Sequence, residues 1–147
     1  MRITLPSGTS AEIVHHESPV MGLVVAPDIF GLRPLYDDLV ARFSREWGMS
    51  VVAVEPFPGA ELGPDIDPRF AAVPALDDAK NLSDLLEAAD ALGTETVGLI
   101  GFCMGGMYCF KAARDERFAR IVSFYGMITL PEAWRSPTHG EPLGMLI

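Results

Sequence analysis

The sequence predicts an α/β fold, a mostly parallel sheet with helices on both faces. Two segments, Gly22–Ala26 and Val97–Phe102, are continuously apolar, as strands covered on both faces by helices are. Longer segments between such runs repeat apolar residues every three or four positions, which is typical of amphipathic helices. The two kinds of segment alternate along the chain. This alternation specifies a parallel sheet with crossover helices.

The first third of the chain predicts a hairpin and then a strand, helix, strand unit. The hairpin strands are Ile3–Leu5 and Ala11–His15, around a turn-forming Pro-Ser-Gly. After the central strand at 22–26, Pro34 can occupy the first turn of a helix that Gly48 ends. The next strand is 50–54, and a right-handed crossover makes it parallel to the first. Apolar residues recur every four positions in this helix, at Leu35, Leu39, Phe43 and Trp47.

The remaining chain continues the alternation after one long irregular stretch. Residues 57–74 hold many Pro, Gly and Asp residues, which predicts a loop with at most a short helix. Apolar spacing then predicts a helix over 76–92 that Gly93 ends. A strand at 97–102, a helix at 104–114 and a strand at 121–125 follow. In such a sheet, sites lie beyond the carboxyl ends of the strands.

Length and composition predict one globular domain, 1–147. Of the 147 residues, 49% are hydrophobic and 21% charged, which is ordinary for a folded protein. The net charge of −9 disfavours non-specific binding to nucleic acid or to an anionic membrane. No apolar run approaches the ~20 residues that span a bilayer, and the N-terminus lacks the apolar stretch of a secretion signal. We therefore expect a cytoplasmic protein.

The two cysteines, Cys103 and Cys109, are expected to be free thiols. On one helix they would lie about 9 Å apart along its axis, beyond the reach of a disulfide. Free thiols suit a reducing compartment. We expect Cys109 to be a small core residue.

Cys103 lies in the sequence Gly101-Phe102-Cys103-Met104-Gly105, at the predicted change from strand to helix. This is the context of a G-x-nucleophile-x-G turn, which exposes a nucleophile at the N-terminus of a helix. The helix dipole would favour the thiolate, and the Met104 N–H could donate to an oxyanion. The alternative is a buried cysteine in a tight turn of a nucleotide-binding sheet, although the G-x-G-x-x-G spacing is absent.

This turn, together with Ala26-Pro27-Asp28-Ile29-Phe30-Gly31 after the earlier strand, resembles the dienelactone hydrolase family. Val54-Glu55-Pro56-Phe57 and Phe124-Tyr125-Gly126 are similar to that family as well, so the resemblance covers essentially the whole chain. It implies an α/β-hydrolase-like fold. It also implies hydrolysis of a small-molecule ester or lactone through an acyl-enzyme on cysteine, without a metal or organic cofactor.

The resemblance also implies roles for five residues. Cys103 matches the nucleophile, and Ile29 and Met104 match the positions whose N–H groups form the oxyanion hole. Asp28 matches an acidic position that helps to generate the thiolate; the alternative is an Asp that caps a turn. Arg69 matches a loop position that can hold an arginine for an anionic substrate; the alternative is a solvated surface arginine.

The usual triad acid and histidine are expected to be missing from these residues. In this fold both come from loops after later strands, so we expect an incomplete domain that lacks its last strands and helices. Such a sheet would leave an unpaired edge and uncovered apolar surface. His139, the one histidine after Cys103, is expected to be an exposed loop residue rather than the base.

The leading hypothesis is therefore a cysteine-dependent ester or lactone hydrolase. One alternative is a non-catalytic small-molecule-binding protein on the same fold. Another is a thiol redox protein, for which no nearby resolving cysteine is present. Substrate identity and oligomeric state are not predicted by the sequence.

Overall fold

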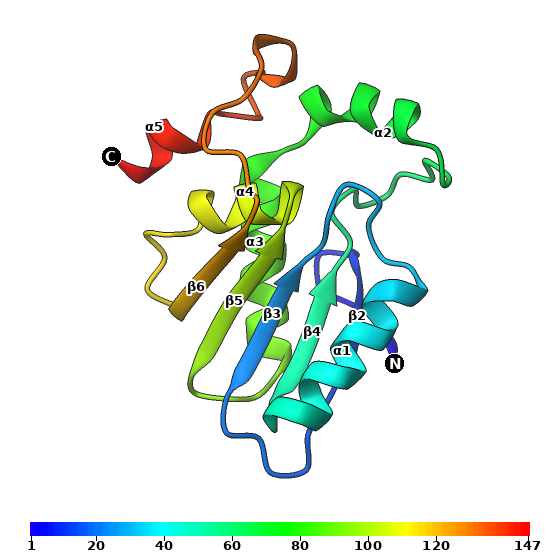
Figure 1. The fold of residues 1–147 in the computed structure, drawn as a ribbon, viewed down its shortest axis with the longest axis vertical. Coiled ribbons are helices and arrows are strands. Elements are labelled where there is room, and N and C mark those ends of the chain that lie inside the picture. Colours follow the sequence, from blue (N-terminus) through cyan, green and yellow to red (C-terminus); the bar gives the residue numbers. More distant parts are fainter.

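The computed structural model describes residues 1–147 and contains one six-stranded sheet. The strands lie in the order β1-β2-β4-β3-β5-β6 (Figure 1). Strand β2 is antiparallel to both of its neighbours, β1 and β4, whereas β4, β3, β5 and β6 run parallel to one another. The strands are β1 (Arg2–Thr4), β2 (Ser10–Val14), β3 (Gly22–Ala26), β4 (Ser50–Val54), β5 (Val97–Phe102) and β6 (Phe118–Phe124).

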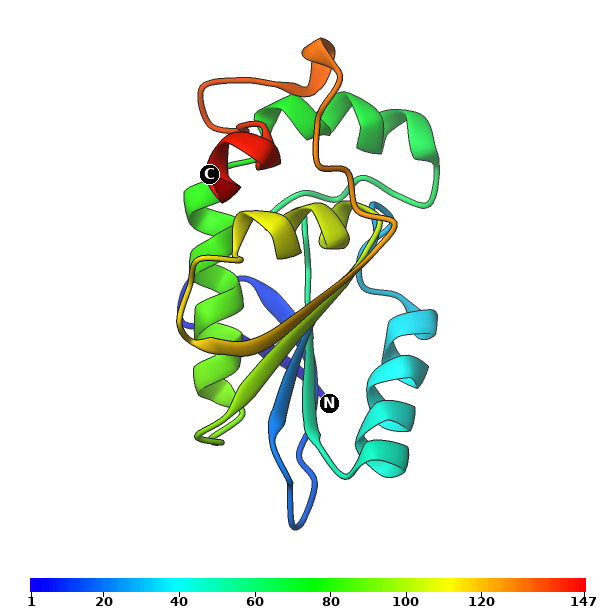
Figure 2. The same ribbon diagram turned by 60° about the vertical axis from the view of Figure 1, so that its left-hand side comes forward.

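Helices cover both faces of the sheet, as the sequence predicts. Helix α1 (Pro34–Trp47) packs on one face, whereas α3 (Asp78–Ala91) and α4 (Met104–Lys111) pack on the other (Figure 2). Strands β3 and β4 lie between these layers and all their residues are buried, which explains why both are continuously apolar. The larger core lies under α3 and α4 and the smaller one under α1.

Shorter elements lie beyond the carboxyl ends of the parallel strands (Figure 1). Helix α2 (Ile66–Ala72) and a 3₁₀ turn at Val73–Ala75 occupy the long irregular stretch between β4 and α3. A second 3₁₀ turn at Glu132–Trp134 and helix α5 (Pro142–Leu146) follow β6. None of these helices is of a length and apolarity that would carry it across a membrane.

The buried face of α1 differs from the simple four-residue repeat. The helix buries Tyr36, Val40 and Ser44, while Leu35 and Trp47 are 53% and 46% exposed. The buried row is thus one position later than the apolar row, and Leu39 and Phe43 are the members of the apolar row that pack against the core.

Two element boundaries differ from the sequence prediction by three residues, and the others that differ do so by one or two. Strand β6 begins at Phe118 rather than 121, and α4 ends at Lys111 rather than 114. Arg120 lies within β6, where its exposed side chain adds no apolar signal. Helix α4 ends near residues that already lie at the surface.

Strand β6 forms one edge of the sheet and is only partly covered. Its residues Val122 and Phe124 are 48% and 45% exposed. Phe124 stacks on Phe102 of β5, with ring centroids 5.3 Å apart. The apolar surface of β5 and β6 on the α1 side therefore extends beyond the area that α1 covers.

Candidate active site

Cys103 lies in the turn between β5 and α4, in a backbone conformation that few side chains adopt. Its φ and ψ angles are 56° and −113°, and Tyr125 is the only other non-glycine residue with positive φ. The Cys103 N–H donates to the Phe124 carbonyl at 3.0 Å, and its own carbonyl accepts from the Met107 N–H at 3.0 Å. The strained conformation is thus held from the strand side and from the helix side.

The glycines around Cys103 are required by close backbone approaches. A Cβ on Gly105 would overlap the Ala26 carbonyl, and a Cβ on Gly101 would overlap the Gly105 carbonyl. A Cβ on Gly106 would lie only 2.8 Å from the Cα of Gly126. The G-x-C-x-G-G spacing is therefore what lets β3, β5 and α4 meet at one point.

The partly exposed Cys103 lines an apolar pocket of about 110 Å³. Phe70 of α2 and Trp134 cover one side, with ring centroids 5.5 Å apart. All the lining residues are hydrophobic: Ile29, Phe70, Val73, Cys103, Met104, Met107, Met127 and Trp134. The pocket therefore offers an apolar surface next to the thiol.

Ile29 and Met104, the two residues expected to form an oxyanion hole, both line this pocket. The Ile29 N–H donates to no other group of the chain. Met104 is the first residue of α4, and N–H groups of a first helical turn have no intrahelical acceptor. Backbone donors are thus available on two sides of the thiol.

Asp28 is placed after β3, and its carboxylate is already occupied. It pairs with Arg33 through Nη1–Oδ1 and Nη2–Oδ2 distances of 2.7 and 2.9 Å. Its Oδ1 also accepts from the Phe30 N–H at 3.0 Å. These contacts cap a turn, the alternative that the sequence leaves open. Its role in generating the thiolate stays a prediction.

Arg69, on α2, bonds backbone carbonyls rather than extending freely into solvent. Its Nη1 donates to the Ile29 carbonyl at 2.9 Å, and its Nε donates to the Gly63 carbonyl at 2.8 Å. Arg69 therefore ties the irregular stretch after β4 to the loop after β3. Binding of an anionic substrate by Arg69 stays a prediction.

The expectation of an exposed His139 is wrong. The side chain is 0% exposed, and Nδ1 lies 2.6 Å from the Trp134 carbonyl. Burial lowers the pKa of His139, and this outweighs the Trp134 carbonyl, which raises it. The residues on either side of His139 hold it in the interior: Thr138 donates to the Leu76 carbonyl just before α3, and the Gly140 N–H donates to Asp78 at the start of α3. It is not among the residues lining the Cys103 pocket.

Cys109 is a core residue, as expected. It is 1% exposed and its thiol donates to the Val122 carbonyl at 3.4 Å. Burial raises the pKa of this thiol to about 12. The two cysteines therefore differ sharply in access.

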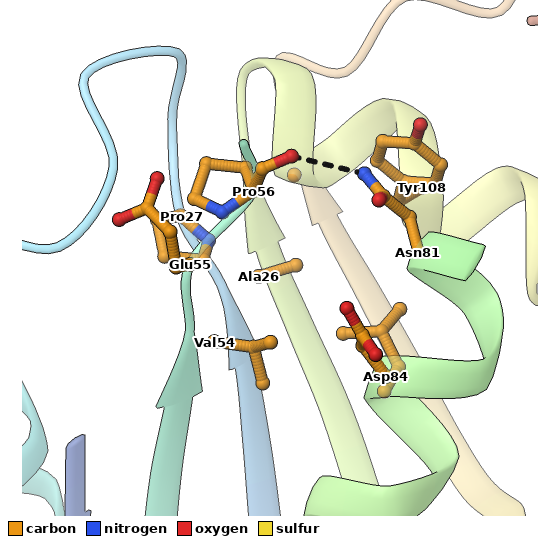
Figure 3. A pocket seen from close by; sticks show the side chains of 10 residues that line it. Ala26, Pro27, Val54, Glu55, Pro56, Asn81, Asp84 and Tyr108 are labelled. Atoms are coloured by element: carbon orange, nitrogen blue, oxygen red, sulfur yellow. Dashed lines mark hydrogen bonds between the residues drawn. The ribbon is translucent and has the colours of Figure 1, made fainter. Parts of the chain in front are cut away.

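A second, small cavity lies between the ends of β3 and β4 and the helices α3 and α4 (Figure 3). Its volume is about 20 Å³, which suits roughly one water molecule. Asn81 of α3 reaches across it and donates to the Pro56 carbonyl at 3.1 Å. Gly105 lines this cavity but Cys103 does not. We regard it as a packing feature beneath the turn rather than a substrate site.

The structure adds site residues that the sequence does not single out. Arg33 reaches Asp28, and Glu55 accepts from the Leu32 and Phe57 N–H groups at 3.1 and 3.2 Å. Trp134 reaches the pocket from the segment after β6. Of these residues, only Glu55 could have been found from the sequence, because it directly follows a predicted buried strand. No group of three or more His, Cys, Asp or Glu side chains is arranged to hold a metal ion.

The model of the dienelactone hydrolase family matches residues 10–143. Carboxymethylenebutenolidase 2 of Cupriavidus pinatubonensis is 30% identical over 105 residues, which are 70% of this chain and 44% of that protein. A probable 2-oxo-3-(5-oxofuran-2-ylidene)propanoate lactonase of Bradyrhizobium sp. is 29% identical over 133 residues, 84% of this chain and 51% of that protein. The chain thus spans about half the length of these curated relatives.

Solved structures share the fold. A putative dienelactone hydrolase from Klebsiella pneumoniae superposes with a TM-score of 0.80 at 24% identity, over 97% of this chain and 65% of that one. A dienelactone hydrolase-like promiscuous phosphotriesterase from metagenomic libraries gives a TM-score of 0.65 at 24% identity, over 90% and 62% of the two chains.

Proposed function

The chain belongs to the dienelactone hydrolase family, and from that membership we propose that it carries the nucleophile and oxyanion-binding half of a carboxylic ester or lactone hydrolase. Cys103 is the nucleophile and Ile29 and Met104 supply the oxyanion donors. The observation that carries the proposal is the Cys103 turn, whose φ of 56° holds a partly exposed thiol beside the free Ile29 N–H.

The proposed reaction proceeds in two steps. The Cys103 sulfur, as the thiolate, attacks the ester carbonyl carbon and forms a C–S bond. The oxygen that becomes negative accepts from the Ile29 and Met104 N–H groups. The C–O bond to the alcohol then breaks, the alcohol oxygen takes a proton from solvent water, and a thioester remains. Water hydrolyses the thioester, which releases the acid and restores the thiol.

Relatives support the choice of ester and lactone chemistry. The names carboxymethylenebutenolidase and lactonase belong to those proteins, and both describe the opening of a lactone ring. A lactone is a cyclic ester, so the same attack on a carbonyl carbon applies. We propose this substrate class for the protein to which these residues belong.

Acylation of the thiol tests the proposal directly. The intact protein is treated with p-nitrophenyl acetate, and the acetyl group is located by mass spectrometry of peptides. We expect acetyl on Cys103 and none on Cys109, whose thiol is buried. Cys103→Ala should abolish the adduct and Cys109→Ala should retain it. An unmodified Cys103 in the folded protein, with no more p-nitrophenol released than by Cys103→Ala, would overturn the proposal.

A second candidate is a small-molecule-binding protein on the same fold. The observation that favours it is the wholly apolar lining of the Cys103 pocket, which suits an apolar ligand whether or not chemistry follows. The Cys109 thiol donates a hydrogen bond to the Val122 carbonyl, whereas the Cys103 thiol makes no hydrogen bond to another group of the chain. Saturable binding of an apolar ester by the intact protein without acylation of Cys103 would favour this candidate.

A further inference from the structure

We propose that Arg33 and Asp28 form a positioning pair that holds the Ile29 N–H where a carbonyl oxygen becomes negative. The inference rests on the proposed function, which supplies that oxygen. It assigns a role to Arg33, and it lets Asp28 act through the backbone of the loop rather than on the thiol.

The pair joins the two ends of the loop between β3 and α1. Arg33 Nη1 donates to Asp28 Oδ1 at 2.7 Å, and Nη2 donates to Oδ2 at 2.9 Å. Such two-point pairs fix orientation as well as distance. The side chains of Arg33 and Asp28 are only 31% and 20% exposed, so water screens the pair less than it would at an open surface.

Further contacts hold the pair in place. Arg33 Nη1 also donates to the Gly31 carbonyl at 3.0 Å, and its guanidinium lies over the rings of Phe30 and Tyr36 at 5.4 and 5.3 Å. Tyr36 is 3% exposed, and its hydroxyl accepts from the Asp28 N–H at 2.9 Å. The loop is thereby anchored to the buried face of α1.

The peptide groups around Ile29 are held, whereas its own N–H is left free. The Phe30 N–H donates to Asp28 and the Ile29 carbonyl accepts from Arg69 at 2.9 Å. The Leu32 N–H donates to Glu55 at 3.1 Å. A free donor in a loop whose other groups are bound has a defined direction. That is the requirement for an oxyanion donor, because a displacement of 1 Å can cost about a hundredfold in rate.

The occupied carboxylate gives Asp28 its role. Three N–H donors already face it, two from Arg33 and one from Phe30. To accept a proton from Cys103 it would first have to leave this pair. Holding the loop requires no such movement.

Two reactions of the same thiol separate positioning from proton transfer. Acetylation by p-nitrophenyl acetate passes through an oxyanion, whereas alkylation by iodoacetamide only exchanges a C–I bond for a C–S bond and releases iodide. We compare both rates in the intact protein and in Arg33→Gln, Asp28→Asn and the double variant. Arg42→Gln, a similar charge change at a 55% exposed site on α1, is the control.

We expect Arg33→Gln and Asp28→Asn to slow acetylation about ten- to a hundredfold while alkylation stays within about twofold. The double variant should be no slower than the slower single variant, since both break one pair. Alkylation of one thiol per chain shows that each variant is folded, because unfolding would also expose Cys109.

Other results overturn the inference in distinguishable ways. An equal loss in acetylation and alkylation for Asp28→Asn alone would assign Asp28 to proton transfer. Unchanged acetylation in all variants would show that the pair does not position the loop. If the unaltered protein neither became acetylated nor released p-nitrophenol faster than Cys103→Ala does, that would instead overturn the proposed function on which the inference rests.

Discussion

Lys111 and Asp78 form an ion pair in the interior, with the ammonium nitrogen 2.9 Å from both carboxylate oxygens. The Lys111 side chain is 0% exposed, and Asp78 also accepts from the Gly140 N–H at 2.8 Å. This pair connects the end of α4, the start of α3 and the segment that buries His139. It lies apart from the Cys103 pocket, so it belongs to stability rather than to chemistry.

Asp78→Asn is expected to destabilise the protein by about 3–5 kcal/mol, since it leaves a buried ammonium without its counter-charge. Urea unfolding measures the loss. Adding Lys111→Met should recover much of the stability, because the buried charge is then removed. Asp38→Asn, at a 67% exposed site on α1, is the control. Equal stability of the Asp78 and Asp38 variants would contradict the expectation.

Because His139 is buried, we expect the free energy of unfolding to decrease as the pH falls. Burial lowers the pKa of His139, so the unfolded chain binds a proton more readily than the folded chain does. The contribution is complete above about pH 6.5 and is lost as pH falls, by at most about 1.4 kcal/mol per pH unit. Urea unfolding at pH 8 and pH 5 should show a smaller loss for His139→Gln. His15→Gln, at an exposed site, is the control and should show the same loss of stability between pH 8 and pH 5 as the unaltered protein. A smaller loss in His15→Gln than in His139→Gln would refute the assignment of the pH dependence to His139.

Gly105→Ala should destabilise the protein by about 3 kcal/mol or more, because the new Cβ would overlap the Ala26 carbonyl in a backbone contact that cannot relax locally. Gly144→Ala in α5 is the control, since nothing lies within 4 Å of its Cβ position. Thermal unfolding compares the two. Similar midpoints would mean that β3 and α4 approach less closely than described.

Replacing Cys103 by glycine should give a more stable protein than replacing it by alanine, by about 1–3 kcal/mol. The angles of 56° and −113° are close to those of the first central position of a type II′ turn, which glycine adopts without strain. Both variants should lose acetylation. Chemical denaturation of the pair measures the strain stored at the nucleophile, and equal stability would show that none is stored.

The apolar pocket predicts a preference for uncharged acyl groups. A carboxylate on the acyl chain would lose its hydration among residues that offer no polar side chain, at a cost on the order of a hundredfold in acylation rate. Acetylation and butyrylation of Cys103 should therefore be much faster than succinylation by the corresponding p-nitrophenyl esters. Faster succinylation would instead point to Arg69 as a carboxylate partner.

The Cys103 turn was predictable because its causes are local. Glycines on both sides of the thiol, between a continuously apolar run and a helical pattern, are enough to indicate a sharp turn. The sheet was predictable for a similar reason, since the covered strands carry an unbroken apolar signal. The fold class is confirmed by the strand order and by the neighbours of this chain.

His139 and Arg33 show where sequence reasoning fails. A histidine in a Pro- and Gly-containing segment has the local features of an exposed residue, but distant contacts of its neighbours with Leu76 and Asp78 hold this segment in the interior. Arg33 is five residues from Asp28, but their meeting depends on how Tyr36 and Glu55 fold the loop. Contacts between residues far apart in the chain decide both cases, and such contacts produce no periodic pattern in the sequence.

The open edge of β6 divides the amides of that strand into two populations. The N–H groups that face β5 are paired, whereas those on the outer side have no neighbouring strand. In hydrogen-exchange experiments β6 should therefore show alternating slow and fast exchange along one strand. A polypeptide that adds to this edge would protect the fast set alone, so exchange at β6 would report such an addition residue by residue.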